Sequence, residues 1–396
     1  MNSFYNKKYV AIIPLRAGSK GIPGKNKKKI LGRPLYQWCL TEAVFSNLDE
    51  VYIFTDDLEI IDQVTSEYSW TDKVKTILRS DINASDTSST EDAMIEFSEA
   101  INWNYTHICL LQATSPLTTA IDINNVLKKF DNTNIDSCLT VVNTKRFIWD
   151  KNAKSINYDY FNRPRRQDFE GLRIENGAIY VTTKEQFQTT KNRLGGKIEM
   201  VEMEEDTLTE IDEISDFIIM EKLLLHRLKV HKSGLEILKL LVLDVDGVFT
   251  PGTVGVSNNG ELFKEFSLRD GMGLDILRKS GVNVIVMTSE TSEIVKSRME
   301  KLKLELFMGV KDKFSRLNHI LMKCDITRNQ VAYVGDDVND LVNICSVGWS
   351  FTPFDAIPLV KEYCDINLIN SGGDKAIREV TDFILKYNSR FQIESK

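Results

Sequence analysis

The sequence predicts an α/β protein of two domains, and three observations support this fold class. At 396 residues the chain is longer than a single hydrophobic core usually serves. Short apolar runs alternate with helical stretches, which is typical of a parallel sheet covered by helices. The alternation stops near residue 230 and then begins again. We therefore expect one domain over residues 1–230 and a second over residues 231–396.

The first domain is expected to contain four strands, at Tyr9–Pro14, Glu50–Thr55, His107–Gln112 and Ser137–Val142. A leucine-rich amphipathic helix is predicted at Asp216–Leu228, and the polar stretch Lys229–Gly234 follows it. The second series of strands is predicted at Leu240–Leu243, Val282–Met287, Leu304–Met308 and Gln330–Val334. Residues Pro251–Phe266 are expected to form a hairpin with Asn258-Asn259-Gly260 at its turn.

Composition excludes several classes of protein. The net charge of -7 argues against a general nucleic-acid binder. No apolar run approaches the roughly 18 residues of a membrane span. The six cysteines form no CxxC pair and lie mostly in apolar runs, so we expect reduced thiols without a disulfide framework or zinc site: Cys39, Cys109, Cys138, Cys324, Cys345 and Cys364. A cytoplasmic protein without nucleic-acid or membrane partners is the resulting expectation.

The loop Leu15–Asn26 follows the first predicted strand and contains three glycines and three cations. Glycines let backbone N–H groups approach an anion, and cations neutralise it. Ligands of open α/β sheets bind at this end of the strands, although the spacing is neither a Walker A nor a GxGxxG motif. The loop therefore predicts a phosphate site, while an ordinary βα loop with exposed lysines is the alternative.

This loop resembles the signature R-x-G-S-K-x-I-P-x-K-N of the CMP-sialic acid synthetases, or acylneuraminate cytidylyltransferases. Further similar blocks follow in the family's order over residues 9–225: Thr55-Asp56-Asp57, Arg79, Ser85–Ser89, Leu110–Leu117, Arg163–Gln167 and Glu175–Tyr180. The resemblance implies a nucleotide-diphospho-sugar transferase-like domain of Rossmann type. It also implies transfer of a cytidylyl group from CTP to a nonulosonic acid of the sialic-acid type.

The same resemblance assigns roles to individual residues. The CTP phosphates and ribose would be bound by Arg16, Ser19, Lys20, Lys25 and Asn26, and cytosine by Arg79 and Ser89. The sugar pocket would contain Gln112, Arg166 and Tyr180. We expect Arg16 and Lys25 to stabilise the charge that builds up around the α-phosphate. We expect Arg166 to bind the sugar's carboxylate through two hydrogen bonds. A buried strand-end amide remains the alternative for Gln112. Plain surface charge remains the alternative for the arginines of this region, and we expect it for at least two of them: Arg163, Arg165, Arg166 and Arg173.

A magnesium ion is expected at an acidic cluster that the family writes D-I-D-x-x-x-D. The aligned segment is Glu210–Asp216, in which Glu210 stands at the position of the first aspartate. Glu210 and Asp212 would point the same way from an extended segment, so both are predicted ligands of Mg²⁺. For Asp216 we favour a role in capping the following helix.

A second motif, Asp244-Val245-Asp246-Gly247, directly follows the strand Leu240–Leu243. Two carboxylates at this spacing can share a metal ion, one acting as nucleophile and the other as acid and base. Thr288, Lys313 and Asp336 follow at or near the ends of later strands. The ordered set resembles the haloacid dehalogenase superfamily over residues 238–385. It is similar to the capless branch that contains phosphatases of eight- and nine-carbon ulosonate phosphates, which implies a haloacid dehalogenase-like Rossmannoid domain.

By that resemblance Asp244 is the nucleophile and Asp246 the acid and base. Thr288 and Lys313 would hold the phosphoryl oxygens, and Asp336 would complete a Mg²⁺ site with Asp244 and the backbone of Asp246. Asp337 and Asp340 would orient water or Lys313. Relatives often have T-G-R where this chain has Thr288-Ser289-Glu290, so we expect a different substrate contact near Glu290.

The two resemblances together imply a bifunctional enzyme in which one domain removes the 9-phosphate of a nonulosonic acid and the other joins the sugar to CMP. An eight-carbon (KDO) pathway fusion is one alternative. A C-terminal domain that serves only oligomerisation is another, although the intact Asp244, Asp246, Lys313 and Asp336 argue against it. Since no cap insertion is visible, we expect an open phosphatase site and a homotetramer. The C-terminal domains would hold it through the Pro251–Phe266 hairpin, with the synthetase domains outside.

Overall fold

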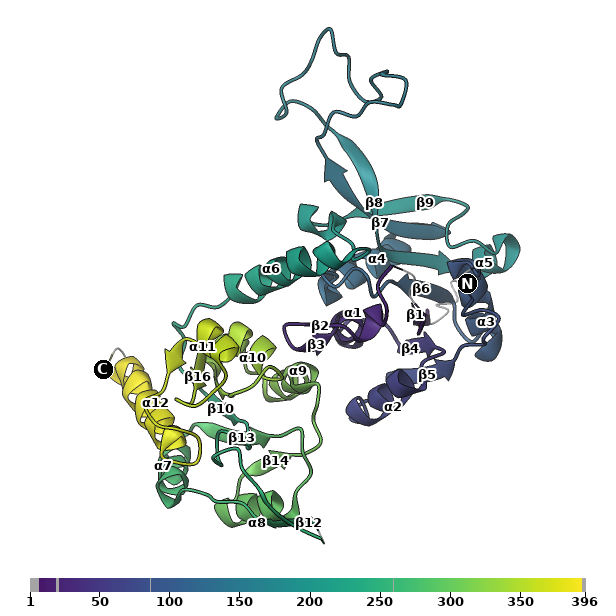
Figure 1. Cartoon of the computed structure of the whole chain (residues 1–396). Coiled ribbons are helices and arrows are strands. Elements are labelled where there is room, and N and C mark those ends of the chain that lie inside the picture. The colour runs from purple at the N-terminus through teal and green to yellow at the C-terminus, as the bar shows by residue number, and fades with distance from the viewer. Residues whose placement is uncertain (1–6, 19–20, 86, 259, 394–396) are drawn as a thin grey trace, which may run out of the picture. The chain divides into compact units, whose positions relative to one another are not determined.

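The computed structural model describes residues 7–18, 21–85, 87–258 and 260–393. The chain divides into two compact units, one of Met1–Ile30 with Pro34–Leu223 and one of Leu31–Arg33 with Leu224–Lys396 (Figure 1). Each unit contains a largely parallel sheet with helices packed against it. The predicted α/β class is thus confirmed.

The sheet of the first unit has seven strands in the order β5-β4-β1-β6-β8-β7-β9. Strand β8 runs antiparallel to β6 and β7, and the other neighbouring pairs are parallel. The strands are β1 (Tyr9–Leu15), β4 (Glu50–Thr55), β5 (Val74–Leu78), β6 (His107–Leu111), β7 (Ser137–Thr144), β8 (Leu172–Thr183) and β9 (Ile198–Glu202). A short pair, β2 (Lys29–Ile30) and β3 (Arg33–Pro34), follows the loop after β1. The four strands expected from sequence are present within two residues of their predicted ends.

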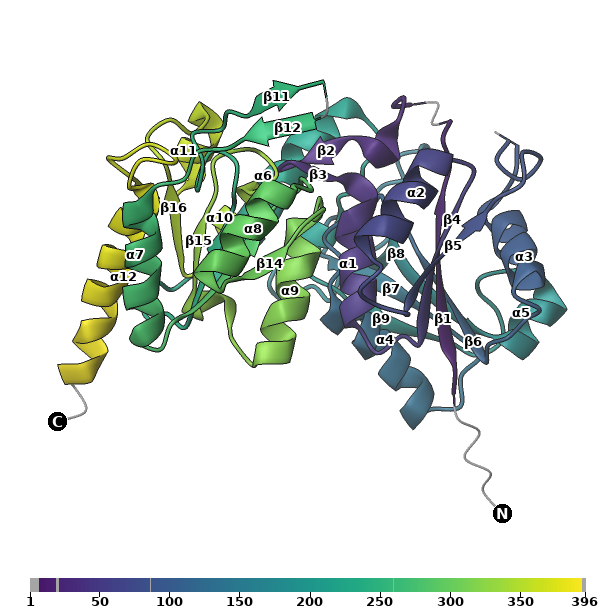
Figure 2. The ribbon, with the colours of Figure 1, turned by 90° about the horizontal axis from the view of Figure 1, so that it is seen from below.

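Helices cover both faces of this sheet (Figure 2). They are α1 (Leu35–Phe45), α2 (Leu58–Glu67), α3 (Thr90–Ala100), α4 (Ala120–Asn132) and α5 (Lys184–Thr190). A further helix, α6 (Ile214–Val230), begins in the first unit and ends in the second. Side chains accept backbone N–H bonds at several helix starts, as Ser89 does for α3 and Thr119 for α4. Such caps satisfy donors that would otherwise have no partner within the helix. The predicted helix Asp216–Leu228 lies within α6.

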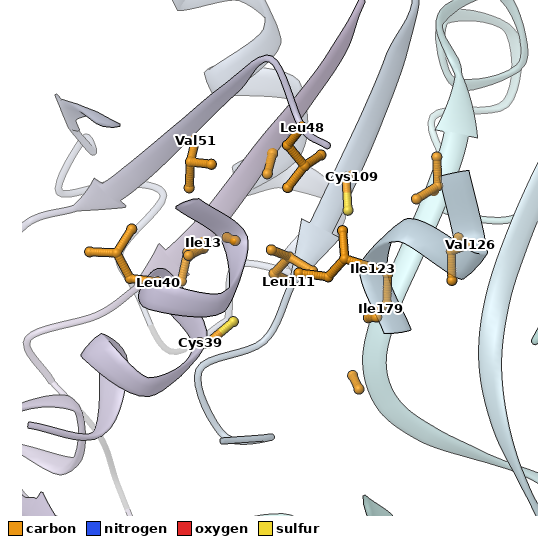
Figure 3. Packing of buried hydrophobic residues seen from close by; sticks show 14 of the residues in the cluster. Ile13, Cys39, Leu40, Leu48, Val51, Cys109, Leu111, Ile123, Val126 and Ile179 are labelled. Carbon is orange, nitrogen blue, oxygen red and sulfur yellow. The ribbon is translucent and has the colours of Figure 1, made fainter. Parts of the chain in front are cut away.

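Two apolar layers pack against the first sheet. On one face, residues of α1, α2 and α4 join inward-facing strand residues such as Ile13 and Leu111 (Figure 3). On the other face, Phe97 of α3 and Phe187 of α5 pack on Ile12 and Leu110. Adjacent residues of one strand thus serve opposite layers, which follows from the two-residue period of a β-strand. The layers fix the strand ends, where the loops with functional residues begin.

An arm of residues 145–171 extends from the ends of β7 and β8 (Figure 1). Aromatic side chains contact one another along it, for example Phe147 with Tyr158 and Trp149 with Tyr160. Phe161 is 85% exposed.

The second unit contains a six-stranded parallel sheet in the order β14-β13-β10-β15-β16-β17. Its strands are β10 (Leu240–Leu243), β13 (Asn283–Met287), β14 (Glu305–Phe307), β15 (Val331–Val334), β16 (Trp349–Thr352) and β17 (Ile366–Asn367). Its helices are α7 (Leu268–Lys279), α8 (Glu293–Leu302), α9 (Lys313–Cys324), α10 (Leu341–Ser346), α11 (Pro358–Tyr363) and α12 (Ala376–Ile393). The expected hairpin is present as β11 (Gly255–Ser257) and β12 (Gly260–Phe263), although Asn259 of its turn lies outside the described residues.

Strand register brings the predicted phosphatase residues to one edge of this sheet. Leu243, the last residue of β10, lies beside Val286 of β13 and Val334 of β15. The chain continues from these positions to Asp244, Thr288 and Asp336, all at the carboxyl ends of the strands. This edge is where open α/β sheets bind their ligands.

All six cysteines are free thiols. Cys39, Cys109, Cys138 and Cys345 are buried, whereas Cys364 is partly exposed and Cys324 is exposed. Burial raises the pKa of the Cys39 thiol to about 12, so it remains protonated at neutral pH. Among the described helices, none combines the length and the apolar character that crossing a membrane would require.

Candidate active sites

A cavity of about 340 Å³ lies at the carboxyl ends of β1 and β6 in the first unit. Seven residues predicted from the sequence line it: Arg16, Lys25, Asn26, Arg79, Ser89, Gln112 and Asp212. They come from five separate stretches of the chain, and the fold places them around one space. Ser19 and Lys20, also predicted to bind the nucleotide, lie outside the described residues.

Hydrogen bonds hold the loop after β1 in shape. The Asn26 side-chain amide donates to the Arg16 carbonyl at 3.1 Å, which ties the two ends of the loop together. The N–H of Ala17 donates to Asp56 Oδ1 at 2.8 Å. Gly24 adopts φ 63° and ψ 27°, a left-handed conformation that favours glycine. Arg16 extends toward the Ser85 carbonyl, to which its Nη1 donates at 3.1 Å.

Arg79 and Ser89 lie on the side of the cavity that leads to α3. Arg79 is buried, its Nη2 donates to the Asn83 carbonyl at 2.6 Å, and its guanidinium lies 5.8 Å from the centre of the Phe54 ring. Burial, together with the Arg16 charge, lowers the pKa of Arg79. Ser89 forms a capping box with Asp92, so its hydroxyl already serves the start of α3. A contribution of Ser89 to nucleotide binding would therefore depend on where it places the first turn of α3.

The acidic segment Glu210–Asp212 contacts the loop after β1. Lys25 Nζ donates to the Ile211 carbonyl at 2.8 Å and lies 3.6 Å from Asp212 Oδ1. The Ile211 N–H donates to the Thr114 carbonyl at 3.0 Å, which fixes the segment beside the end of β6. Asp212 is exposed toward the cavity, which it lines, whereas Glu210 is half-buried. Burial and the Asp212 charge raise the pKa of Glu210.

Gly177 explains how the longer Glu210 side chain is accommodated. Its φ is +67°, and a Cβ atom added there would lie 2.4 Å from Glu210 Oε1. Only glycine fits both the backbone conformation and the space. Asp216 has a different task, because its Oδ2 accepts the N–H groups of Asp212 and Glu213 at 2.8 and 2.7 Å. Asp216 lies in the first turn of α6 and stabilises the start of that helix.

The predicted sugar residues are only partly brought together. Gln112 lines the cavity, whereas Tyr180 and Arg166 are not among its lining residues. The Tyr180 hydroxyl donates to Glu175 Oε2 at 2.9 Å. The Arg193 guanidinium lies 5.2 Å from the centre of the Tyr180 ring. Arg166 is exposed on the arm of residues 145–171.

In the second unit a buried lysine joins two buried carboxylates. Lys313 Nζ lies 2.8 Å from Asp244 Oδ2 and 2.7 Å from Asp340 Oδ1. The Tyr333 hydroxyl also donates to Asp340 Oδ1, at 2.6 Å. Burial, and then the Asp340 charge, raise the pKa of Asp244. Burial lowers the pKa of Lys313, but the two carboxylates outweigh it and leave that pKa above its usual range.

Asp336 completes a cluster whose chemistry suits a divalent cation. Oxygen atoms of Asp244, Asp336 and Asp340 lie within 4.8 Å of one another, and the Asp336 Oδ1 atom is buried with no hydrogen-bond partner. Burial and the Asp340 charge raise the pKa of Asp336 to about 7. Three carboxylates face one ammonium group, so a divalent cation would balance the remaining charge. A Cβ atom at Gly247 would lie 2.0 Å from Asp336 Oδ2, so glycine keeps the space open.

Asp246 and Thr288 lie at the same edge of the sheet. Thr288 is buried, and its Oγ1 accepts the N–H of Glu290 at 3.3 Å. Asp246 Oδ1 accepts hydrogen bonds from Thr250 Oγ1 at 3.2 Å and from Lys264 Nζ at 2.7 Å. Asp337 is exposed, and its Oδ1 accepts the N–H of Val338. Of Asp337 and Asp340, Asp340 is the one that the structure places against Lys313.

Comparison with known proteins identifies the family. Residues 10–234, more than half of the chain, match the family described as Cytidylyltransferase. The chain belongs to the cytidylyltransferase family. It is therefore a nucleotidyltransferase, and the 340 Å³ cavity with the loop after β1 lies within its cytidylyltransferase region.

Individual relatives cover both halves of this cytidylyltransferase. It is 31% identical to N-acylneuraminate cytidylyltransferase A of Danio rerio, over 97% of this chain and 90% of that protein. It is also 35% identical over 160 residues to the 3-deoxy-D-manno-octulosonate 8-phosphate phosphatase of Haemophilus influenzae, which covers 40% of this chain and 89% of that enzyme. The solved structure of the cobalt-bound deoxy-D-mannose-octulosonate 8-phosphate phosphatase from Haemophilus influenzae is 35% identical to this chain. It covers 40% of this chain and 92% of its own chain, with a TM-score of 0.38.

Sequence reasoning did not single out Arg193, Thr250 or Lys264 of the cytidylyltransferase as site residues. Thr250 belongs to the run after Asp244, so its position could have indicated it. Arg193 and Lys264 reach Tyr180 and Asp246 from distant segments, and nothing in their local sequence distinguishes them from surface charges.

Proposed function

We propose that the first unit transfers a cytidylyl group from CTP to a nonulosonic acid of the sialic-acid type, giving a CMP-sugar and pyrophosphate. The observation that carries the proposal is the set of seven predicted residues around one polar cavity. The similarity to N-acylneuraminate cytidylyltransferases over nearly the whole chain supports the class of sugar.

Charge placement suggests how this reaction proceeds. The anomeric oxygen of the sugar attacks the α-phosphate, the bond to pyrophosphate breaks, and negative charge grows on the equatorial and leaving oxygens. Arg16 and Lys25 supply fixed positive charge to those oxygens, and the hydrogen bonds of both side chains hold them in place before reaction. Glu210 and Asp212 would hold Mg²⁺, which supplies further charge neutralisation when bound. Gln112 would position the sugar.

We propose that the second unit is a magnesium-dependent sugar-phosphate phosphatase. Asp244 attacks phosphorus and forms an aspartyl phosphate, while Asp246 gives a proton to the departing sugar oxygen. Asp246 then accepts a proton from the water that hydrolyses this intermediate. Lys313 and Thr288 hold the phosphoryl oxygens. Asp244 and Asp336, two of the three clustered carboxylates, would hold Mg²⁺ together with the backbone of Asp246, and the ion would supply charge neutralisation on those oxygens when bound.

The 9-phosphate of a nonulosonic acid is the substrate we favour, because its product is the acceptor of the first reaction. An eight-carbon substrate is the second candidate, since the chain is similar over about 40% of its length to 3-deoxy-D-manno-octulosonate 8-phosphate phosphatases. Both reactions would take place in the cytoplasm, a proposal that the six free cysteines support.

One set of assays tests both proposals. Free neuraminic, deaminated and diamino nonulosonic acids, and KDO, are incubated separately with CTP and Mg²⁺, and CMP-sugar and pyrophosphate are measured. The corresponding 9-phosphates and KDO 8-phosphate are assayed for phosphate release. We expect CMP-sugar from at least one nonulosonic acid, and faster release from its 9-phosphate than from KDO 8-phosphate. If KDO alone is activated, the first proposal is wrong; if no phosphate ester is hydrolysed, the second is wrong.

A further inference from the structure

Lys264 binds both carboxylate oxygens of Asp246. Its Nζ lies 2.7 Å from Oδ1 and 3.0 Å from Oδ2. The Lys264 side chain is only 3% exposed, whereas that of Asp246 is 34% exposed. A buried ammonium group needs neighbouring negative charge, and the carboxyl groups of two acidic residues, Asp246 and Glu261, lie within 3.4 Å of Lys264 Nζ.

Lys264 is itself held from the other side. It directly follows strand β12 of the hairpin, and its Nζ lies 3.4 Å from Glu261 Oε1 on the same hairpin. Glu261 in turn accepts a short hydrogen bond from Ser292, the residue that caps α8. A chain of contacts therefore runs from the start of α8 through the hairpin to the carboxyl group of Asp246.

The two oxygens of Asp246 are not equivalent in this arrangement. Oδ1 accepts hydrogen bonds from Lys264 and Thr250, whereas Oδ2 accepts only the longer bond from Lys264 among the described residues. Because Oδ1 is held by two donors, Oδ2 keeps more of its lone-pair capacity for another group. Oδ2 is thus the oxygen available to carry the proton in the reaction.

We propose that Lys264 is a positioning residue of the phosphatase, which fixes the rotation of the Asp246 carboxyl group so that Oδ2 faces the departing oxygen. The inference rests on the proposed phosphatase function. Lys264 transfers no proton. As the bond between phosphorus and the sugar oxygen breaks and the bond to Asp244 forms, the proton on Asp246 moves to the sugar oxygen. In the second step a proton of the attacking water passes to Asp246 as the bond between phosphorus and Asp244 breaks.

Leaving-group dependence gives a test that a purely structural role would not pass. A sugar alkoxide is strongly basic and needs a proton as it departs, whereas p-nitrophenolate leaves with little help. Because the second step is the same for both esters, the comparison uses kcat/KM, which reports the formation of the aspartyl phosphate. In Lys264→Met we expect kcat/KM for the sugar phosphate to fall about 100-fold and kcat/KM for p-nitrophenyl phosphate to fall only a few-fold. Asp246→Asn should show the same selective loss, and the double variant should lose little more than Asp246→Asn alone. An equal loss on both phosphates, or additive losses in the double variant, would overturn the proposal.

Further variants separate positioning from folding. Lys264→Arg keeps a cation and should recover part of the sugar-phosphate rate. Glu261→Gln removes one anchor of Lys264 and should give a smaller loss in the same direction. Lys279→Met serves as control, since that lysine is 74% exposed and pairs with Asp275 on α7. Wild-type protein that hydrolyses neither ester would refute the phosphatase function itself, and the inference with it. Active wild-type protein with an unselective Lys264→Met variant would refute the inference alone.

Discussion

Single charged side chains determine the chemistry of each candidate site. Some of these residues could be predicted from the sequence, and others could be found only from their contacts in the structure. Arg16 and Lys25 belong to a loop that follows a strand and combines glycines with cations, so the local sequence predicted a phosphate site, and both residues line the cavity. Lys264 could not be found in this way, because its role depends on a hairpin folding back onto Asp246. For Arg166, the resemblance predicted sugar binding; its side chain is exposed on the arm, and the assignment stays a prediction.

Replacing Arg16 by alanine should abolish CMP-sugar formation and leave phosphate release near the wild-type rate. The variant loses a fixed positive charge at the cavity, which typically costs about 100-fold or more in rate. Both activities are measured on the same preparation with CTP and with a phosphate ester. Lys28→Ala is the matched control, because Lys28 is an exposed cation of the same segment that does not line the cavity. Equal loss of both activities in folded Arg16→Ala protein would contradict two separate sites.

Asp244→Asn should have the reverse effect. The amide keeps the shape of the side chain but removes the charge that attacks phosphorus, so phosphate release should fall to background while CMP-sugar formation persists. Trapping of a radiolabelled aspartyl phosphate, present in wild type and absent in the variant, provides an independent measurement. Ester hydrolysis at the wild-type rate by this variant would show that the nucleophile is misassigned.

At the scale of elements, the sequence predicted most of the buried strands, although it missed β16 and also predicted β14, in which no residue is buried. Strands β1, β4, β6 and β10 are continuous apolar runs because helices cover them on both sides. Strand β5 was not predicted because none of its residues is fully buried, and its sequence lacks an apolar run. The first residues of β8 are likewise exposed and polar, so its 12-residue length does not show in its composition. Pairing with neighbouring strands, rather than the local sequence, determines where strands of this kind form and end.

Helix α3 links stability to nucleotide binding through its cap. Ser89→Ala removes the capping hydroxyl and should lower the free energy of unfolding by about 1 kcal/mol. Because the first turn of α3 lines the cavity, we also expect a higher KM for CTP with a smaller change in kcat. Thr119→Ala removes an equivalent capping box from α4, away from the cavity, and should cost similar stability without altering the KM for CTP. If both variants raise KM equally, general destabilisation rather than the position of α3 is responsible.

For the molecule as a whole, stability should depend on magnesium and pH together. The pKa of Asp336 is raised to about 7 from an ordinary value of 3.8, so the folded protein binds more protons than the unfolded chain between these values. The free energy of unfolding of the metal-free protein should therefore fall as pH rises through this window. Bound Mg²⁺ would offset the repulsion among the carboxylates.

Thermal unfolding with Mg²⁺ or with a chelator measures this effect. We expect Mg²⁺ to raise the Tm of the second unit more at about pH 8 than at about pH 5.5. In Asp336→Asn the difference between the two pH values should shrink. A magnesium-induced increase in Tm that is the same at both pH values would contradict the prediction.

Assembly is the remaining prediction at this scale. The hairpin of β11 and β12 exposes three apolar side chains: Val256 (68%), Leu262 (64%) and Phe263 (53%). Apolar side chains that are exposed together often mark a protein–protein interface. We predict a homotetramer that uses this hairpin, and light scattering should give four times the chain mass at micromolar concentration. Leu262→Ser with Phe263→Ser should yield smaller species, whereas Ile369→Ser, at an exposed residue outside the hairpin, should not. A wild-type monomer that is fully selective for one ulosonate phosphate would refute this.

The backbone of Ile211 makes two hydrogen bonds: its N–H donates to the carbonyl of Thr114, after β6, and its carbonyl accepts from Lys25 in the loop after β1. Its side chain is 0% exposed, whereas Asp212 beside it is exposed. A buried aliphatic group thus sets the depth at which Glu210 and Asp212 stand. Trimming or enlarging it would shift both carboxylates without touching either, so variation at this core position would change the affinity of the proposed magnesium site while every polar residue of that site stays the same.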